Sequence, residues 1–224
     1  MSEWWRYDVA DFLLFAPQTY WRLFALQNAA YWPLQIAASV GVTALLVLAL
    51  ARWRWTGALG GLLLSAATLF VALTFLRDRY EPINWAIGGA LPLFYLQAAL
   101  VAVLGPRLSF VGGSGWGGIA LLCLSLAYPL LAPLDGRPLN EAEVVGLAPD
   151  PTAVAILGFA GLARCGWAVL TLVILPLLWL LVSAATLFTM GAATAFVPVG
   201  AVVVAIASLL YMCRRRRRAA NRPQ

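Results

Sequence analysis

The sequence predicts an all-α fold, a polytopic bundle of about seven transmembrane helices that follows an N-terminal interfacial helix. Two observations predict this fold. Hydrophobic residues form 63% of the 224-residue chain and charged residues 11%, whereas about a quarter of the residues of a soluble domain are charged. In addition, the apolar residues gather into stretches separated by short polar gaps, at 31–50, 58–75, 86–105, 117–134, 152–163, 167–186 and 191–212.

Residues 1–30 form a separate N-terminal segment, in which residues 9–29 mix apolar and polar side chains. Asp11 and Arg22 make this stretch too polar to span a membrane. Such a helix can instead lie among the lipid headgroups with its apolar side chains in the membrane. Pro17 is expected to interrupt it. Residues 1–16 lack the basic start and the small-residue cleavage site of a signal peptide.

The apolar stretches make up a bundle over residues 31–212, and residues 213–224 form a basic cytoplasmic tail. A spanning helix needs roughly 20 apolar residues, and the stretch 152–163 is clearly shorter. Two interpretations compete for it. It can span by continuing past Arg164, whose side chain can reach the interface, or it can be re-entrant. Spanning is favoured, because otherwise the basic tail would emerge outside.

Arginines predict the orientation. They lie in every second gap, at Arg52, Arg54, Arg107 and Arg164, and again in the tail, while the intervening gaps are neutral or acidic. Arginines in short loops stay on the cytoplasmic side of the membrane. The prediction is therefore an N-terminus outside the cytoplasm and a C-terminus inside it.

The excess of arginine also bears on partners. The net charge is +6, and an uninterrupted block directly follows the last apolar stretch: Arg214, Arg215, Arg216, Arg217 and Arg218. A basic cluster at the cytoplasmic end of a helix contacts anionic lipid headgroups. We therefore expect this block to bind membrane lipids and not nucleic acid.

Missing residue types exclude several kinds of chemistry. The chain has no histidine and no lysine, which excludes histidine-ligated metals, a histidine base and a Schiff base. Cys123, Cys165 and Cys213 lie on separate segments, and their predicted depth or cytoplasmic position argues against disulfides. We expect no catalytic residue, no metal and no cofactor, and hence no enzyme.

The middle of each apolar stretch carries neither a carboxylate nor an arginine. Charges inside a membrane are costly and mark ion or proton pathways, so this pattern argues against an ion-coupled pump. Polar residues inside the stretches, such as Gln97, Thr68 and Ser183, are better explained by hydrogen bonds between helices than by a substrate path.

The remaining polar residues concentrate on the predicted outer face. The segments around residues 28–35, 76–85 and 135–151 end there, and we expect them to pack together beneath the N-terminal helix. They carry a candidate binding cluster of Asn28, Trp32, Gln35, Glu81, Asn84, Trp85 and Glu143. Asp150, directly before Pro151, is interpreted as the cap that starts the next helix.

One sequence segment recurs. Residues 63–70 read LLSAATLF and residues 181–188 read LVSAATLF. Close packing of small Ser-Ala-Ala faces would explain both segments and is favoured. The alternative is a duplication of three spans around a linker helix, as in some transporters.

The stretches Asn28–Gln35, Pro82–Asn84 and Glu143–Thr152 resemble an uncharacterised family of small bacterial multi-spanning membrane proteins, a domain of unknown function. The likeness covers most of the chain. It implies a multi-pass protein of the bacterial inner membrane. It implies no activity and assigns no functional residue.

Two functions are in competition. The leading hypothesis is a non-catalytic accessory or assembly subunit of a membrane complex, because catalytic residue types are missing and ten tryptophans suit lipid and protein interfaces. The alternative is a facilitator for a small neutral or weakly polar solute, with prolines as kink sites and Gln35 and Gln97 as hydrogen-bonding groups. A cavity that continues between the spans would favour the facilitator. A third class, an enzyme acting on lipid headgroups, has carboxylates but no base, nucleophile or metal.

Overall fold

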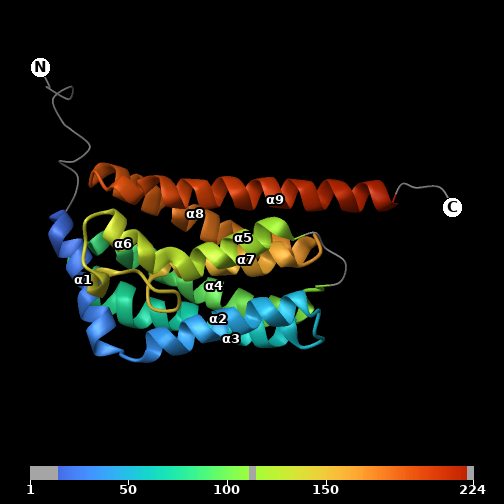
Figure 1. Ribbon diagram of the computed structural model, residues 1–224, viewed down its shortest axis with the longest axis horizontal. Coiled ribbons are helices and arrows are strands. Elements are labelled where there is room, and N and C mark those ends of the chain that lie inside the picture. The colour runs from blue at the N-terminus through green and yellow to red at the C-terminus, as the bar shows by residue number, and fades with distance from the viewer. Residues whose placement is uncertain (1–14, 111–114, 221–224) are drawn as a thin grey trace, which may run out of the picture.

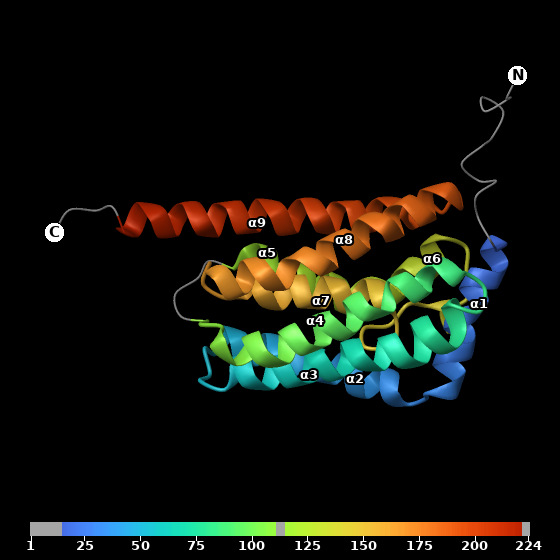
Figure 2. The same ribbon diagram turned by 180° about the vertical axis from the view of Figure 1, so that it is seen from behind.

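The computed structural model describes residues 15–110 and 115–220, and this part of the chain folds into a helix bundle. Long helices lie side by side along the long axis (Figure 1): α2 (Leu34–Leu50), α3 (Thr56–Phe70), α4 (Leu91–Leu104), α5 (Trp116–Ala127), α7 (Pro149–Leu162), α8 (Trp167–Thr189) and α9 (Phe196–Ala220). Shorter segments extend or connect them: η3 (Val71–Tyr80), η4 (Trp85–Gly89), η5 (Gly105–Arg107), η6 (Tyr128–Leu130), α6 (Leu131–Leu134), η7 (Leu139–Glu141) and η8 (Ala193–Ala195). The view from behind shows α1 (Pro17–Ala30) crossing one end (Figure 2). The predicted all-α bundle is confirmed.

Five helical stretches in the described residues are long and apolar enough to cross a membrane: Thr56–Tyr80, Trp85–Arg107, Trp116–Leu134, Trp167–Thr189 and Ala193–Arg216. A sixth results if α1 and α2, which meet at 90°, form one broken span. The predicted count of seven is not confirmed, because α7 has only 14 residues and α2 qualifies only together with α1. The orientation stays a prediction.

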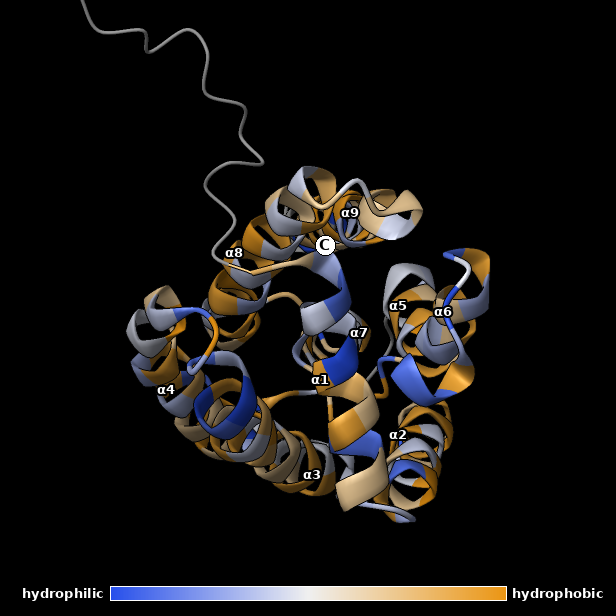
Figure 3. Cartoon of the chain, turned by 90° about the vertical axis from the view of Figure 1, so that its left-hand side faces the viewer, coloured by the Kyte–Doolittle hydropathy of each residue, from blue (hydrophilic) through white to orange (hydrophobic). Residues whose placement is uncertain are grey.

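Helix α7 lies in the middle of the bundle. Figure 3 looks along the long axis and shows α7 surrounded by the other long helices, and all of its residues from Pro149 to Leu162 are buried. At 1.5 Å per residue it is about 21 Å long, shorter than the hydrocarbon core of a bilayer. The expectation that it continues past Arg164 is wrong, because the helix ends at Leu162 and the Arg164 amide donates to the Ser109 carbonyl at 2.7 Å.

Glycines allow α7 to approach its neighbour α5 closely. A Cβ atom on Gly118 of α5 would lie 2.6 Å from the carbonyl carbon of Gly161 and 2.7 Å from the amide nitrogen of Leu162. Both atoms belong to the backbone of α7, which cannot yield as a side chain can. Small residues at a helix interface are a general device for close packing in membranes. Here they let the central helix fit between its neighbours.

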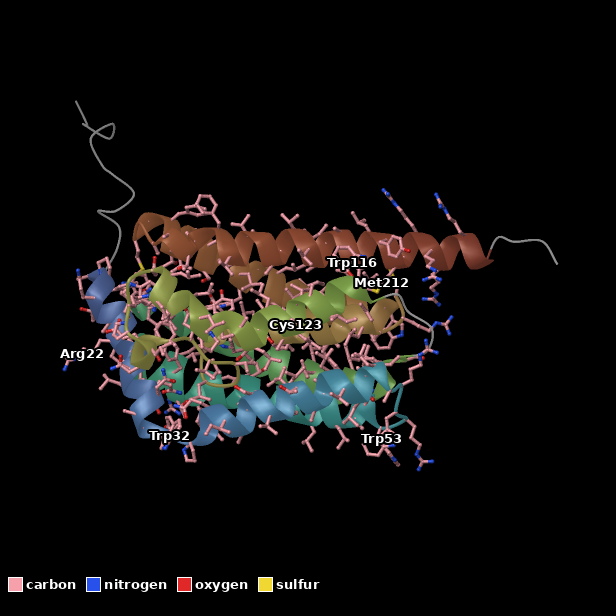
Figure 4. The ribbon with its side chains drawn as sticks, viewed as in Figure 1. Arg22, Trp32, Trp53, Trp116, Cys123 and Met212 are labelled. Carbon is pink, nitrogen blue, oxygen red and sulfur yellow. A yellow bond between two sulfur atoms is a disulfide. The ribbon has the colours of Figure 1, made fainter. Side chains whose placement is uncertain are left out.

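Helix α1 closes one end of the bundle. It begins at Pro17, in the first turn where proline is tolerated, after Ala16 in an extended conformation. The predicted helix over 9–29 lies partly outside the described residues, so an interruption at Pro17 stays a prediction. Residues 1–14, on which the predicted absence of a signal peptide mainly rests, lie outside the described residues. Phe24 stacks on Phe75 of η3 with ring centroids 4.7 Å apart, whereas Arg22 points away from the bundle (Figure 4). The apolar side of α1 therefore packs on protein.

Tryptophans mark both ends of α2. Trp32 and Trp53 lie at opposite ends of this helix and point outward (Figure 4). They are 68% and 47% exposed. Tryptophan side chains gather at the two interfaces of a membrane, and this placement agrees with a bundle that stands across the bilayer along its long axis.

The structure joins Cys165 and Cys213 in a disulfide with the Cα atoms 5.3 Å apart, which corrects the expectation that the cysteines stay unpaired. Cys165 lies in the turn before α8 and Cys213 near the end of α9, and these two packed helices bring both residues to the same end of the bundle. Arg216 donates to the backbone oxygen of Cys165 there. Disulfides persist in oxidising compartments, while arginines favour the cytoplasmic side, so this end carries two opposing signals about orientation.

Thiol counting tests this disulfide. The denatured protein should take up one maleimide–polyethylene glycol adduct without reductant, on Cys123, and three after reduction. Both counts can be read as mobility shifts on a gel. As a control, Cys165→Ser should give two adducts under both conditions. Three adducts on the wild-type protein without reductant would contradict the disulfide.

Candidate functional site

A cavity of about 360 Å³ lies between α3, α4, α7 and α8 and reaches Tyr20 of α1. Apolar side chains form most of its wall. A few polar groups interrupt them, chiefly Thr68, Asn84, Gln97, Thr152, Trp179 and Ser183. A cavity of this size and composition is typical of a site for a small, largely apolar molecule.

Exposed residues of α4 and α8 line one part of the cavity. Leu93 of α4 and Val182 of α8 line it and are 46% and 57% exposed, whereas Thr68 and Gln97, which also line it, are buried. Both helices belong to stretches that are long and apolar enough to cross a membrane.

A proline and a glutamine shape the inner wall. Pro176, inside α8, lacks an amide hydrogen, so it cannot donate to the Leu172 carbonyl one turn earlier. Gln97 of α4 supplies the missing donor, with its Nε2 3.1 Å from that carbonyl oxygen. The Oε1 atom of Gln97 is buried without a hydrogen-bond partner. Because buried polar atoms are normally paired, this oxygen is a candidate acceptor for a ligand that carries a hydroxyl or amide hydrogen.

A buried carboxylate lies behind the cavity wall. Asp150 is 1% exposed, and its Oδ1 accepts from Trp179 Nε1 at 2.8 Å. Its Oδ2 accepts from the Ser183 hydroxyl and, at 3.5 Å, from Tyr128. The interpretation of Asp150 as a helix cap is wrong, because Ala148 occupies the N-cap position of α7, without a side-chain cap bond. Asp150 instead ties α7 to α8.

The segment before α7 enters the bundle as irregular backbone. Residues 142–148 are all buried. The Gly146 amide donates to the Thr152 hydroxyl at 2.8 Å, and that hydroxyl donates to the Ala148 carbonyl at 2.7 Å. Irregular backbone at membrane depth is tolerated where protein surrounds it. The turn places the start of α7, and with it Asp150, beside the middle of α8.

Glu143 is a second buried carboxylate in this segment. It is 5% exposed, and its Oε2 is buried without a hydrogen-bond partner. Burial raises the pKa of the Glu143 carboxyl well above its usual range, the nearby Asp150 carboxylate raises it further, and Arg137 opposes the shift. The fold thus holds two carboxylates away from water.

The predicted packing of the outer segments is confirmed. Gln27 of α1 donates to the Thr74 hydroxyl at 2.8 Å and accepts from Arg79 at 2.6 Å, which links α1 to η3. Asn28 donates to the carbonyls of Asn140 and Ala142 at 2.9 and 2.8 Å, which links α1 to the segment before α7. These contacts cover the Asp150 end of the bundle.

The residues of the predicted outer cluster separate into groups. Gln35 donates to the Asn28 carbonyl at 2.7 Å, which joins these two, and Glu143 lies buried in the segment that Asn28 contacts. Asn84 lines the cavity. Trp32 and Trp85 are 68% and 78% exposed.

Glu81 lies in the same turn as Asn84, whose amide donates to the Glu81 carbonyl at 3.1 Å, and its Oε1 would be 2.8 Å from a Cβ added at Gly88. A shared binding role for the predicted cluster stays a prediction.

The arginine block forms the end of α9, where the side chains of Arg214, Arg216 and Arg218 are exposed. Its contact with lipid headgroups also stays a prediction.

Comparison with known proteins identifies a family for this arrangement. The family model described as "Family of unknown function (DUF6064)" matches residues 17–221. The chain belongs to the DUF6064 family. The predicted likeness to an uncharacterised family is thereby confirmed. Searches of curated proteins and of solved structures returned no match for this DUF6064 chain.

Sequence reasoning found part of the wall of the DUF6064 cavity: Asn84 belongs to the predicted outer cluster, and Gln97 is a hydrogen-bonding group of the facilitator hypothesis. It favoured helix packing for Ser183, interpreted Asp150 as a cap and gave Trp179 no role. One signal was available: the buried segment 142–148 is nearly all apolar and directly precedes a helix too short to span. Broken segments of this kind often form binding sites in membrane proteins.

Proposed function

We propose that this protein is a multi-pass protein of the bacterial inner membrane that binds a small neutral molecule in its cavity and facilitates its passage. The single observation that supports this function best is the cavity between α3, α4, α7 and α8, whose wall combines exposed apolar residues of α4 and α8 with buried polar groups. The molecule would enter between α4 and α8 and reach the outer face past Asn84, which lines the cavity near the end covered by α1.

The wall chemistry defines the class of molecule. Most of the wall is apolar, so the body of the ligand should be apolar. Gln97 Oε1 needs a hydrogen-bond donor, and Thr68 and Ser183 add hydroxyl groups. The best match is a neutral compound with a hydrocarbon or aromatic body and one hydroxyl or amide group.

Photolabelling tests this function. A diazirine analogue of octanol, added to the protein in proteoliposomes, should label peptides of α4 and α8 that contain cavity residues, as mapped by mass spectrometry. Val182→Trp should reduce this labelling several-fold, because Val182 lines the mouth and the larger ring would fill it. Leu181→Trp is the matched control, since Leu181 is its exposed neighbour outside the cavity wall.

Equal labelling of the two variants would show that the probe samples the lipid-facing surface and would overturn the proposed function. The accessory-subunit hypothesis has a separate test. It requires a partner that stays bound after extraction in mild detergent. A stable partner combined with an unlabelled cavity would replace the facilitator with the accessory subunit.

A further inference from the structure

Asp150 and Glu143 are two buried carboxylates at the start of α7 and in the segment before it, and Asp150 contacts side chains of the cavity wall. The hydrogen-bond donors to Asp150 are neutral groups, from Trp179, Ser183 and Tyr128. Burying a carboxylate without a cation is costly unless hydrogen bonds or a proton compensate it. Trp179 and Ser183 also line the cavity. The protonation state of Asp150 can therefore affect the ligand site through its hydrogen bonds to these two side chains.

Opposing effects act on the charge of Asp150. Burial favours the protonated form, while the three donors favour the ionised form. The titratable and charged groups that face the pair from the surrounding elements are Tyr20, Tyr80, Tyr128, Arg137 and Asp135.

Of these groups, Arg137 is the positive one, and it is engaged elsewhere. It pairs with Asp135 at 3.3 Å and lies over the Trp21 ring at 3.5 Å. Because Asp135 and Trp21 share the charge of Arg137, a proton is the counter-charge that can complete the neutralisation of the two buried carboxylates.

We propose that Asp150 and Glu143 form a proton-binding site that sets the hydrogen-bonding polarity of the cavity wall at Ser183. This inference rests on the proposed function for its ligand, but the proton site itself stands on the buried carboxylates. It goes beyond the neutral facilitator, because it makes binding of the ligand depend on pH.

The hydrogen bond between Ser183 and Asp150 transmits the change. When Asp150 is ionised, the Ser183 hydroxyl donates to it, and the lone pairs of Ser183 can accept from a ligand. When Asp150 takes a proton from solvent, its own O–H can donate to Ser183 Oγ. The Ser183 hydrogen is then free to turn toward the cavity and donate to a ligand.

Infrared difference spectroscopy across a pH titration detects the proton directly. As the pH rises from about 4 to about 9, the infrared spectrum of the wild-type protein in proteoliposomes should lose the carbonyl band of a protonated carboxylic acid. Asp150→Asn should lack the Asp150 part of this change. Asp78→Asn is the matched control, because it removes an exposed carboxylate and should retain the Asp150 part of the change.

Photolabelling with the diazirine analogue of octanol measures the link to the cavity. Labelling of the wild type should change by about 2- to 10-fold across the titration, the effect of one hydrogen bond gained or lost. Ser183→Ala retains the carboxylate, so the infrared transition should persist and move to higher pH, since the ionised form loses a donor. Labelling of that variant should become independent of pH. Ser183→Ala also serves if Asp150→Asn fails to fold.

The outcomes separate the two proposals. Absence of the infrared transition in the wild type, or an unchanged transition in Asp150→Asn, would overturn the proton site. Labelling that changes with pH equally in wild type and Ser183→Ala would overturn the role of Ser183. An infrared transition without any labelling of the cavity would leave the proton site in place and overturn the proposed function.

Discussion

Replacing Asp150 with serine is expected to destabilise the folded protein by about 2–5 kcal/mol, because each buried donor left without an acceptor costs about 1–3 kcal/mol. The serine side chain is too short to reach both Trp179 and Ser183, which donate to the carboxylate across the α7–α8 contact. Reversible unfolding in mixed micelles of a mild detergent and sodium dodecyl sulfate measures the difference.

Serine distinguishes the two roles of Asp150, because serine caps helices as well as aspartate does. If Asp150 only capped α7, Asp150→Ser would stay within about 0.5 kcal/mol of the wild type, and that outcome would contradict the buried-acceptor role. Asp78→Ser is the control, since this exposed carboxylate should be nearly silent.

The second large effect is expected at the contact between α5 and α7. Gly118→Ala should cost about 3 kcal/mol, because the added Cβ would meet the α7 backbone at Gly161 and Leu162 at 2.6–2.7 Å and the helices would have to separate. The same unfolding assay measures it.

Gly200→Ala is the matched control for this contact. Gly200 lies in α9, and a Cβ there meets nothing within 4 Å. Alanine should therefore stabilise the protein slightly, by about 0.5–1 kcal/mol, through its higher helix propensity. Equal effects of the two substitutions would show that α5 and α7 are not packed through Gly118.

Composition and apolar length were sufficient to predict the helix bundle, because both depend only on local sequence. The stretch predicted at 167–186 became α8 (Trp167–Thr189), and that at 117–134 became the span Trp116–Leu134. The same reasoning failed for α2 and α7, whose lengths have to be judged with the segments that precede them. A bundle interior relaxes the length requirement, since a helix surrounded by protein need not match the lipid.

The role of Asp150 could not be read locally. Aspartate before proline is a common helix start, and that signal is satisfied by the neighbouring sequence alone. The donors that determine its real role lie 22 to 33 residues away, on η6 and α8. Only the tertiary arrangement shows that Asp150, which lies before an apolar stretch in the sequence, is buried inside the bundle. The sequence-based argument that the bundle contains no charged residue therefore fails.

The repeated segment shows the same limit. Thr68 of α3 and Thr186 of α8 occupy matching positions of the two copies, and both line the cavity. The same position of the repeat therefore contributes to one cavity from two different helices. The serines differ: Ser65 donates to the Ala98 carbonyl at 2.8 Å, which is helix packing, while Ser183 donates to Asp150. Close packing explains one copy and only part of the other.

The complete burial of α7 has a consequence for how the protein is made. A segment of 14 residues that starts with a carboxylate between two prolines gains little by moving from the translocation channel into lipid, since a carboxylate is penalised there. It gains its stability from protein on every side. We therefore expect α7 to enter the membrane only with its neighbours, held between α5 and the emerging α8, so that membrane insertion and tertiary folding are one step for this part of the chain.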